Sequence, residues 1–194
     1  MTTIGILLFD RAEELDVVGP WEVFTSARRD GDVVVTVAEH AGVVRFAKGM
    51  RVLPDHTFDD CPPLDVVVVP GGQGTRTEVD NPVLMAWLAA VSAQATWVTS
   101  VCTGSLLHWG TGVARGRTVT THWNFVETLR AKGDITVVDD QRWVVDGNLV
   151  TSAGVSAGID MALWLVGQLH GEEHARNVQH WIEYDPEPPY RMPA

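Results

Sequence analysis

The sequence predicts an α/β fold, a three-layer sandwich in which helices cover both faces of a mostly parallel central sheet. The first observation is that strongly apolar runs, such as 3–9 and 65–69, have the composition of strands buried on both faces. The second is that such runs alternate along the chain with segments of helical periodicity. Since 194 residues suffice for one sizeable core, we expect a single domain over 1–194 with an irregular tail over 185–194.

Local signals place the individual elements. The first strand leads into a charged loop over 10–16 and then a helix over 18–28, whose first turn accommodates Pro20. Asn81 and Pro82 fit the N-cap and first position of the next long helix. The other expected elements are strands at 32–38, 65–69, 96–101, 118–121, 135–138, 142–145 and 149–152, hairpins of 43–46 with 50–53 and around Asp146-Gly147, and helices at 82–94, 123–131, 155–170 and 172–181.

Charge and cysteine content exclude several classes of function. With 14 basic and 25 acidic residues the net charge is −11, which argues against non-specific binding to nucleic acid or anionic membranes. No apolar run approaches the length of a membrane span, and the N-terminus reads as a first strand rather than a signal peptide. Two cysteines give no disulfide framework, so we expect a cytoplasmic protein. The partner we expect, in place of nucleic acid or a membrane, is a small-molecule substrate.

Cys102 stands where the strand over 96–101 turns into a helix that ends near Gly110. A thiol at such a turn is the cysteine version of a nucleophile elbow. Unpaired N–H groups at the helix start and the helix dipole favour a thiolate, so we expect a lowered pKa. Gly104 allows a tight backbone turn beside the sulfur. The competing interpretation is an inert cysteine buried in the core.

Two other strand ends carry residues that could serve the same chemistry, because parallel strands bring their carboxyl ends to one edge of the sheet. Asp16 is the candidate general acid/base, with a pKa that burial could raise, and its alternative role is an N-cap. The N–H groups of Gly72 and Thr103 are candidate donors to a developing anion, and the Thr103 hydroxyl could orient substrate or water. Gly71 and Gly72 permit close backbone approach, although a plain tight turn has the same composition.

Thr103 follows Cys102, which excludes a histidine base adjacent in sequence. His122 is the alternative base or a substrate-binding group, although a structural histidine is at least as well supported. Trp123 suggests an apolar pocket wall. Glu13 reads as an exposed loop charge. No spacing of histidines, cysteines and carboxylates indicates a metal site.

These residues lie in segments that resemble the ThiJ/PfpI superfamily, and the segments span nearly the whole chain in the family's order. The resemblance implies a flavodoxin-like fold of the class I glutamine amidotransferase type, with the cysteine at a nucleophile elbow. The matching segments are Glu14-Leu-Asp16-Val-Val-Gly-Pro20, Val69-Pro-Gly-Gly72, Thr99-Ser-Val-Cys-Thr-Gly-Ser105, Thr120-Thr-His-Trp123, Asp146-Gly-Asn-Leu-Val-Thr151 and Ala157-Gly-Ile-Asp160.

Within the superfamily the chain resembles the isocyanide hydratases. That resemblance implies a homodimeric hydro-lyase, without cofactor or metal, that converts an isocyanide and water into an N-substituted formamide. It assigns nucleophilic attack and a thioimidate intermediate to Cys102, proton transfer to Asp16, and polarisation of the intermediate to Thr103 and Gly72. The features that carry it are Asp16 where many relatives have Glu, the elbow Ser100-Val-Cys-Thr-Gly-Ser105, the segment Cys61-Pro-Pro-Leu-Asp65, and the ending Ile182-Glu-Tyr-Asp-Pro-Glu-Pro-Pro-Tyr190.

Two alternatives within the superfamily stay open. A glyoxalase- or deglycase-like enzyme would more often carry Glu at the position of Asp16 and histidine at that of Thr103. A redox- or ligand-sensing protein would use Cys102 as an oxidisable thiolate.

Overall fold

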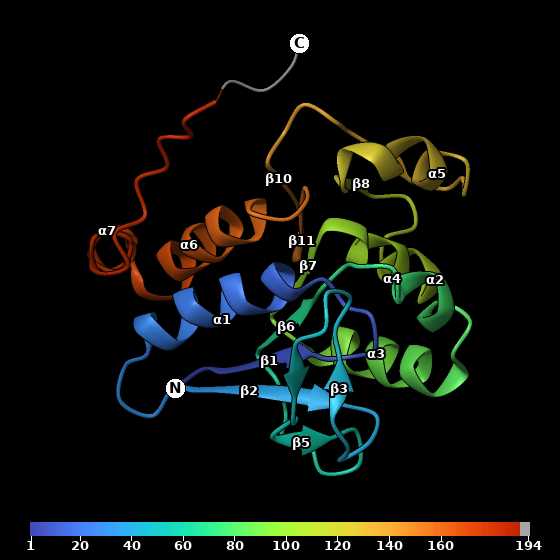
Figure 1. Ribbon diagram of the computed structural model, residues 1–194, viewed down its shortest axis with the longest axis horizontal. Coiled ribbons are helices and arrows are strands. Elements are labelled where there is room, and N and C mark those ends of the chain that lie inside the picture. The colour runs from blue at the N-terminus through green and yellow to red at the C-terminus, as the bar shows by residue number, and fades with distance from the viewer. Residues whose placement is uncertain (191–194) are drawn as a thin grey trace.

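The computed structural model describes residues 1–190, which form a seven-stranded sheet between two layers of helices (Figure 1). The strand order is β10-β11-β7-β6-β1-β2-β5. All neighbours are parallel except β10 and β11, which form an antiparallel hairpin. The strands are β1 (Thr3–Leu7), β2 (Val33–Ala38), β5 (His56–Thr57), β6 (Val66–Val69), β7 (Trp97–Val101), β10 (Trp143–Asp146) and β11 (Leu149–Ser152).

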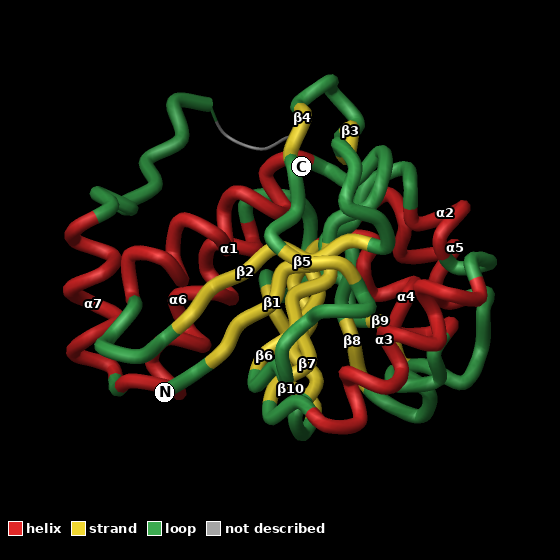
Figure 2. The backbone as a smooth tube through the Cα atoms, turned by 90° about the horizontal axis from the view of Figure 1, so that it is seen from below, coloured by secondary structure: helices red, strands yellow, loops and turns green. Residues whose placement is uncertain are grey.

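The helices divide between the two faces of this sheet, which Figure 2 shows almost edge-on. One layer contains α1 (Glu14–Ala27), α6 (Ala157–His170) and α7 (Glu172–Trp181). The other contains α2 (Thr75–Glu78), α3 (Pro82–Gln94), α4 (Ser105–Gly110) and α5 (Val126–Arg130). The arrangement confirms the predicted fold class.

Short elements complete the described part of the chain. β3 (Val44–Arg45) and β4 (Arg51–Val52) form the expected antiparallel hairpin. β8 (Thr118–Val119) pairs in parallel with β9 (Thr136–Val137). Two 3-10 turns cover Cys102–Gly104 and Trp123–Phe125.

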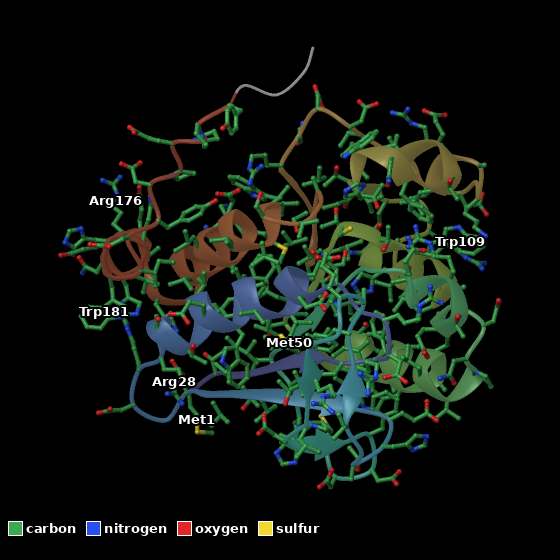
Figure 3. All side chains as sticks on the ribbon, viewed as in Figure 1. Met1, Arg28, Met50, Trp109, Arg176 and Trp181 are labelled. Atoms are coloured by element: carbon green, nitrogen blue, oxygen red, sulfur yellow. The ribbon has the colours of Figure 1, made fainter. Side chains whose placement is uncertain are left out.

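The core follows from the apolar runs recognised in the sequence. Every side chain of β6 is fully buried, because the strand lies between β1 and β7 with a helical layer on each face. Trp97 of β7 packs edge-on against Trp164 of α6. Other tryptophans lie at the periphery of the molecule, Trp109 on one side and Trp181 on the other (Figure 3).

The first helix differs most from the sequence-based prediction. It begins at Glu14, four residues before the expected start at residue 18, so the charged loop predicted over 10–16 ends at residue 13. Pro20 therefore lies inside the helix instead of in its first turn. Pro20 alone predicts the wrong start. The acidic side chains of Glu14 and Asp16 are the signal that agrees with the observed start, because negative charge in the first turn stabilises a helix.

Smaller differences occur elsewhere. No local pattern predicts the two-residue strand β5 or the four-residue helix α2. The helix predicted over 123–131 divides into a 3-10 turn and α5. Residues 185–190 contain no helix or strand, and the rest of the predicted tail, 191–194, lies outside the described residues. None of the helices in the described chain is long and apolar enough to cross a membrane.

Candidate active site

Cys102 occupies the junction of β7 and the 3-10 turn that precedes α4. Its φ of 57° lies in the left-handed region, which is costly for a residue with a side chain. Hydrogen bonds on both sides hold this conformation. The Cys102 N–H donates to the Ala153 carbonyl at 3.3 Å, and the Cys102 carbonyl accepts from the hydroxyls of Thr121 at 2.9 Å and Ser105 at 3.2 Å. The predicted nucleophile elbow is therefore present as a strained and well-supported turn.

Glycines let the end of β6 approach this elbow closely. A Cβ on Gly71 would lie 2.8 Å from the Cys102 Cβ and 2.5 Å from the Thr103 nitrogen. A Cβ on Gly104 would collide with the carbonyl of Val69. Because Gly104 has an ordinary helical φ of −58°, it is needed for this close approach rather than for the turn itself.

Asp16 reaches the same place from the first turn of α1. Its side chain is fully buried, and Oδ2 accepts a hydrogen bond from the Gly71 N–H at 2.9 Å. Its other oxygen, Oδ1, is buried without a hydrogen-bond donor among residues 1–190. Burial raises the pKa of Asp16 to about 7, and the hydrogen bonds from Gly71 and from Cys102 oppose that rise. The N-cap position of α1 belongs to Glu13, so the alternative N-cap role of Asp16 is wrong.

The expected low pKa of Cys102 is also wrong. Burial and, to a lesser extent, the nearby Asp16 charge raise the pKa of this thiol to about 12, because the hydrogen bonds from Thr103 only partly oppose them. Only one 3-10 turn and a six-residue helix follow the cysteine, and their favourable field is outweighed by desolvation. Cys102 is therefore a thiol at neutral pH, and a thiolate must be made by proton transfer to a neighbouring base. Asp16 is the candidate base, since a side-chain hydrogen bond with Cys102 is among the influences on its pKa.

The amides predicted to hold an anion have protein partners in this structure. The Gly71 N–H is bonded to Asp16, and the Gly72 N–H donates to the Thr103 hydroxyl at 3.0 Å. The Thr103 hydroxyl also accepts from Thr75 Oγ1 at 3.2 Å. The Thr103 N–H instead hydrogen-bonds the Cys102 sulfur, where it lowers the pKa of the thiol.

A small cavity of about 150 Å³ opens in front of Cys102 and Thr103. Its walls are mostly polar, and none of the described tryptophans contributes to them, contrary to the expected apolar pocket. Trp123 is 76% exposed and lies outside the lining. His122 does line the cavity, with its Nδ1 2.6 Å from Asn124 Oδ1. The lining residues are Glu13, Ala47, Gly72, Gln73, Arg76, Cys102, Thr103, His122, Asn124 and Val155.

Two charged residues of this lining are not among the site residues predicted from the sequence. Glu13 is half-buried and pairs with Lys48, so its description as an exposed loop charge is wrong. Arg76, in α2, donates to the Thr103 hydroxyl at 3.2 Å. The signal that could have identified Arg76 is its place four residues after Gly72, where the chain leaves the sheet edge.

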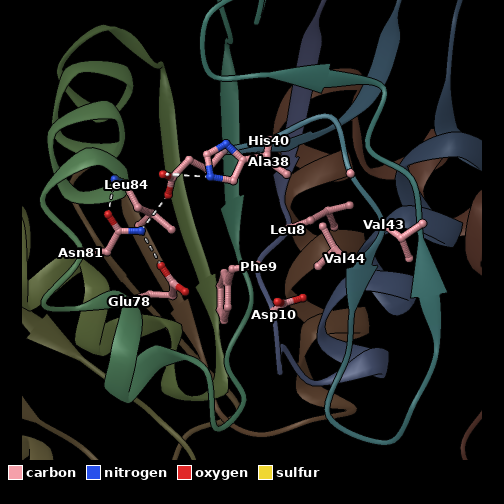
Figure 4. A pocket seen from close by; sticks show the side chains of 12 residues that line it. Leu8, Phe9, Asp10, Ala38, His40, Val43, Val44, Glu78, Asn81 and Leu84 are labelled. Carbon is pink, nitrogen blue, oxygen red and sulfur yellow. Dashed lines mark hydrogen bonds and ion pairs between the residues drawn. The ribbon is translucent and has the colours of Figure 1, made fainter.

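A larger cavity of about 470 Å³ lies near the ends of β1 and β2 (Figure 4). Phe9, His40, Glu78 and Asn81 contribute to its walls, and the Asn81 amide donates to Glu78 at 2.9 Å. None of the predicted catalytic residues lines it, so the smaller cavity, which Cys102 and Thr103 line, is the candidate active site. Within residues 1–190, no three side chains of His, Cys, Asp or Glu converge closely enough to hold a metal ion.

Fold and site together define an α/β protein with a buried cysteine at a strand-to-helix elbow and a buried carboxylic acid beside it. The chain belongs to the DJ-1/PfpI family, whose model matches residues 2–168. This confirms the family resemblance noted in the sequence.

Individual relatives agree with this membership. Isonitrile hydratase of Pseudomonas putida is 42% identical over 188 residues, which cover 96% of this chain and 80% of that protein. The Parkinson disease protein 7 homolog of Danio rerio is 32% identical over 180 residues, covering 90% and 93%. The crystal structure of a ThiJ/PfpI family protein from Pseudomonas syringae superposes with a TM-score of 0.91 at 34% identity, covering 97% of this chain and 77% of that one.

Proposed function

We propose that this protein hydrates isonitriles (isocyanides) to N-substituted formamides. The observation that carries the proposal is the buried pair of Cys102 and Asp16, in which the carboxyl group has a pKa of about 7 next to a protonated thiol. A nucleophile and a proton carrier with a pKa near the working pH are what this addition requires. The 42% identity to isonitrile hydratase supports the same reaction.

The reaction begins when the Asp16 carboxylate takes the proton of the Cys102 thiol and the sulfur attacks the terminal isonitrile carbon. A C–S bond forms, and Asp16 returns the proton to that carbon. The product is a thioimidate, R–N=CH–S–Cys, with Asp16 ionised again.

Water completes the cycle. Asp16 takes one proton as the hydroxide adds to the thioimidate carbon, and it passes that proton to the nitrogen. The C–S bond then breaks, the hydroxyl proton moves to Asp16 and on to the departing sulfur, and R–NH–CHO leaves. The sum is one isonitrile and one water consumed for one formamide, with thiol and carboxylate restored.

The remaining predicted residues would assist these steps. The Thr103 N–H stabilises negative charge on the sulfur, since it already lowers the pKa of Cys102. The Gly72 N–H could turn from the Thr103 hydroxyl to an anionic intermediate. The position of His122 in the cavity lining supports a role in substrate contact, whereas Trp123, which is exposed outside the lining, would need to move to take part.

The direct test is to mix the purified protein with cyclohexyl isocyanide and follow formation of the formamide, with methylglyoxal as the competing substrate. We expect turnover of the isocyanide and none by Cys102→Ala. Consumption of methylglyoxal alone would contradict the proposal and favour the glyoxalase-like alternative. Normal isocyanide hydration by Cys102→Ala would contradict the mechanism.

We also propose that the protein is a homodimer in the cytoplasm. Apolar side chains are exposed at the start of α1, where Leu15 is 39% exposed, and on the β3–β4 hairpin, where Leu53 is 65% exposed. Both cysteines are free thiols, as a reducing compartment would keep them. Light scattering of the purified protein tests the dimer, and a monomeric mass would contradict it.

A further inference from the structure

Arg76 places a fixed cation at the rim of the Cys102 cavity. Its Nη1 donates to the Gly72 carbonyl at 2.7 Å, to Thr75 Oγ1 at 3.1 Å and to the Thr103 hydroxyl at 3.2 Å. Its guanidinium carbon lies 4.5 Å from the centre of the Phe125 ring. A long side chain that would otherwise sample many rotamers is thereby held in one orientation.

No carboxylate of residues 1–190 forms an ion pair with Arg76. Its Nε and Nη2 atoms make no hydrogen bond within the described chain, so these donors are free to meet a ligand. Burial lowers the pKa of this guanidinium, as expected for a cation without a counter-charge.

The acidic groups near the cavity do not supply that counter-charge. Glu13 is already paired with Lys48. Asp16 is bonded to the Gly71 N–H, and its raised pKa leaves it partly uncharged at neutral pH. Within the described part of the chain, Arg76 therefore carries a permanent charge in the cavity lining that no neighbouring carboxylate neutralises.

We propose that Arg76 binds a carboxylate on the substrate, so that the preferred substrates are small isonitriles bearing a carboxylate group. This inference rests on the proposed hydration and specifies its substrate class. A guanidinium presents two parallel donors that match a carboxylate, and the bond is stronger when both groups are charged. The mostly polar lining, which also includes Gln73 and Asn124, suits such a ligand better than an alkyl chain.

The size of the cavity limits the length of this substrate. About 150 Å³ is well below the range of roughly 300–1,000 Å³ that holds drug-sized ligands, so few atoms can separate the carboxylate from the reacting carbon. Isocyanoacetate, with one methylene between the two groups, is the simplest member of the class. Addition of water across its isonitrile carbon gives N-formylglycine, and the carboxylate itself is unchanged.

The first experiment compares kcat/KM for isocyanoacetate with that for its uncharged methyl ester. We expect the wild-type protein to favour the acid and Arg76→Gln to lower the acid-to-ester ratio at least about tenfold, the range expected for loss of a charge-assisted hydrogen bond. Arg115→Gln is the matched control, because Arg115 also lies over an aromatic ring, that of Trp109, but does not line the cavity. It should leave the ratio unchanged.

An equal ratio in wild type and Arg76→Gln would overturn the proposal and assign Arg76 only to supporting Thr103. If the wild-type protein hydrates neither these compounds nor cyclohexyl isocyanide, the hydratase function fails instead. A second readout keeps the two failures apart, because it needs no hydratase activity. It measures alkylation of Cys102 by anionic iodoacetate and by neutral iodoacetamide, resolved from Cys61 by peptide mass spectrometry. Arg76→Gln should lower the iodoacetate-to-iodoacetamide rate ratio severalfold relative to Arg115→Gln, and an unchanged ratio would overturn anion recognition by Arg76.

Discussion

Cys61 and Cys102, the two cysteines of the chain, lie in contrasting surroundings although neither is ionised at neutral pH. Cys61 is half-buried in the loop before β6, where its thiol donates to the Pro62 carbonyl at 3.3 Å. Burial raises its pKa to about 11, against about 12 for Cys102. Thiol pKa therefore does not distinguish the two.

The backbone and the neighbouring base do distinguish them. Cys102 is held at a positive φ, with the buried Asp16 carboxyl group and the Thr103 N–H beside its sulfur. The charged neighbour of Cys61 is Asp60, whose carboxylate is exposed and raises the pKa of the Cys61 thiol. If Cys102 is the nucleophile, as we propose, its reactivity depends on the buried carboxyl group beside it and not on a preformed thiolate. The helix dipole alone predicts a lowered pKa for Cys102, and this prediction is wrong because burial has the larger effect.

The largest expected effect separates the two cysteines directly. Cys102→Ala should lower kcat for isonitrile hydration by more than about 10³-fold, because the covalent step is lost. Cys61→Ala should leave kcat within about twofold, since its thiol lies in a different cavity. Steady-state kinetics on both purified variants check this. Comparable losses in the two variants would remove the distinction.

Removing the base should come next. Asp16→Asn keeps an oxygen that can accept from the Gly71 N–H but cannot take a proton from Cys102, so kcat should fall by about 10²–10⁴-fold. Circular dichroism of the variant controls for folding. Activity of the folded variant near the wild-type rate would show that another group, such as His122, moves the proton.

The same substitution should stabilise the fold. The pKa of Asp16 is about 7 in the folded protein against 3.8 ordinarily, so the folded state binds this proton more tightly than the unfolded state. Stability is therefore lost as the pH rises from about 3.8 to about 7. Asp16→Asn should raise the free energy of unfolding by about 2–4 kcal/mol at pH 8, and the gain should shrink towards zero near pH 4. Urea unfolding at both pH values measures it. Destabilisation at pH 8 would mean that the carboxylate is stabilised in the fold by contacts that outweigh its burial.

The smallest effect concerns the close approach of β6 to the elbow. Gly71→Ala would place a methyl group 2.5 Å from the Thr103 nitrogen, so we expect about 1–3 kcal/mol of destabilisation together with reduced hydration. Gly42→Ala is the control, because a Cβ there meets nothing within 4 Å and the φ of Gly42 is not positive. Equal unfolding curves for the two variants would show that the loop after β6 yields easily.

Much of this architecture could be predicted from the sequence. The unbroken valines of β6 identify a doubly covered strand, and the parallel topology then requires the ends of β1, β6 and β7 to meet. That geometry brings Asp16, the Gly71-Gly72 loop and Cys102 together without any knowledge of side-chain positions.

The rest depends on packing that no local pattern encodes. The pKa of Cys102 is raised by burial under several elements, so the direction of its shift cannot be predicted from one strand and turn. The same holds for the hydrogen bond from the Gly72 N–H to the Thr103 hydroxyl. Trp123 follows His122 in the chain, yet at this 3-10 turn Trp123 is exposed to solvent while His122 lines the cavity. The sequence does not show that Arg76 lines the cavity or that no carboxylate of residues 1–190 pairs with it, because both depend on the tertiary structure.

Proton transfer from Cys102 to the Asp16 carboxylate is tested most directly by the pH dependence of kcat/KM for isonitrile hydration, because this parameter reports the ionisations of the free enzyme. If Asp16 accepts the proton, kcat/KM of the wild-type protein should rise with pH through an apparent pKa of about 7, where Asp16 ionises, and this step should be missing from the residual activity of Asp16→Asn. A profile without a step between pH 6 and 8, or the same step in Asp16→Asn, would contradict it.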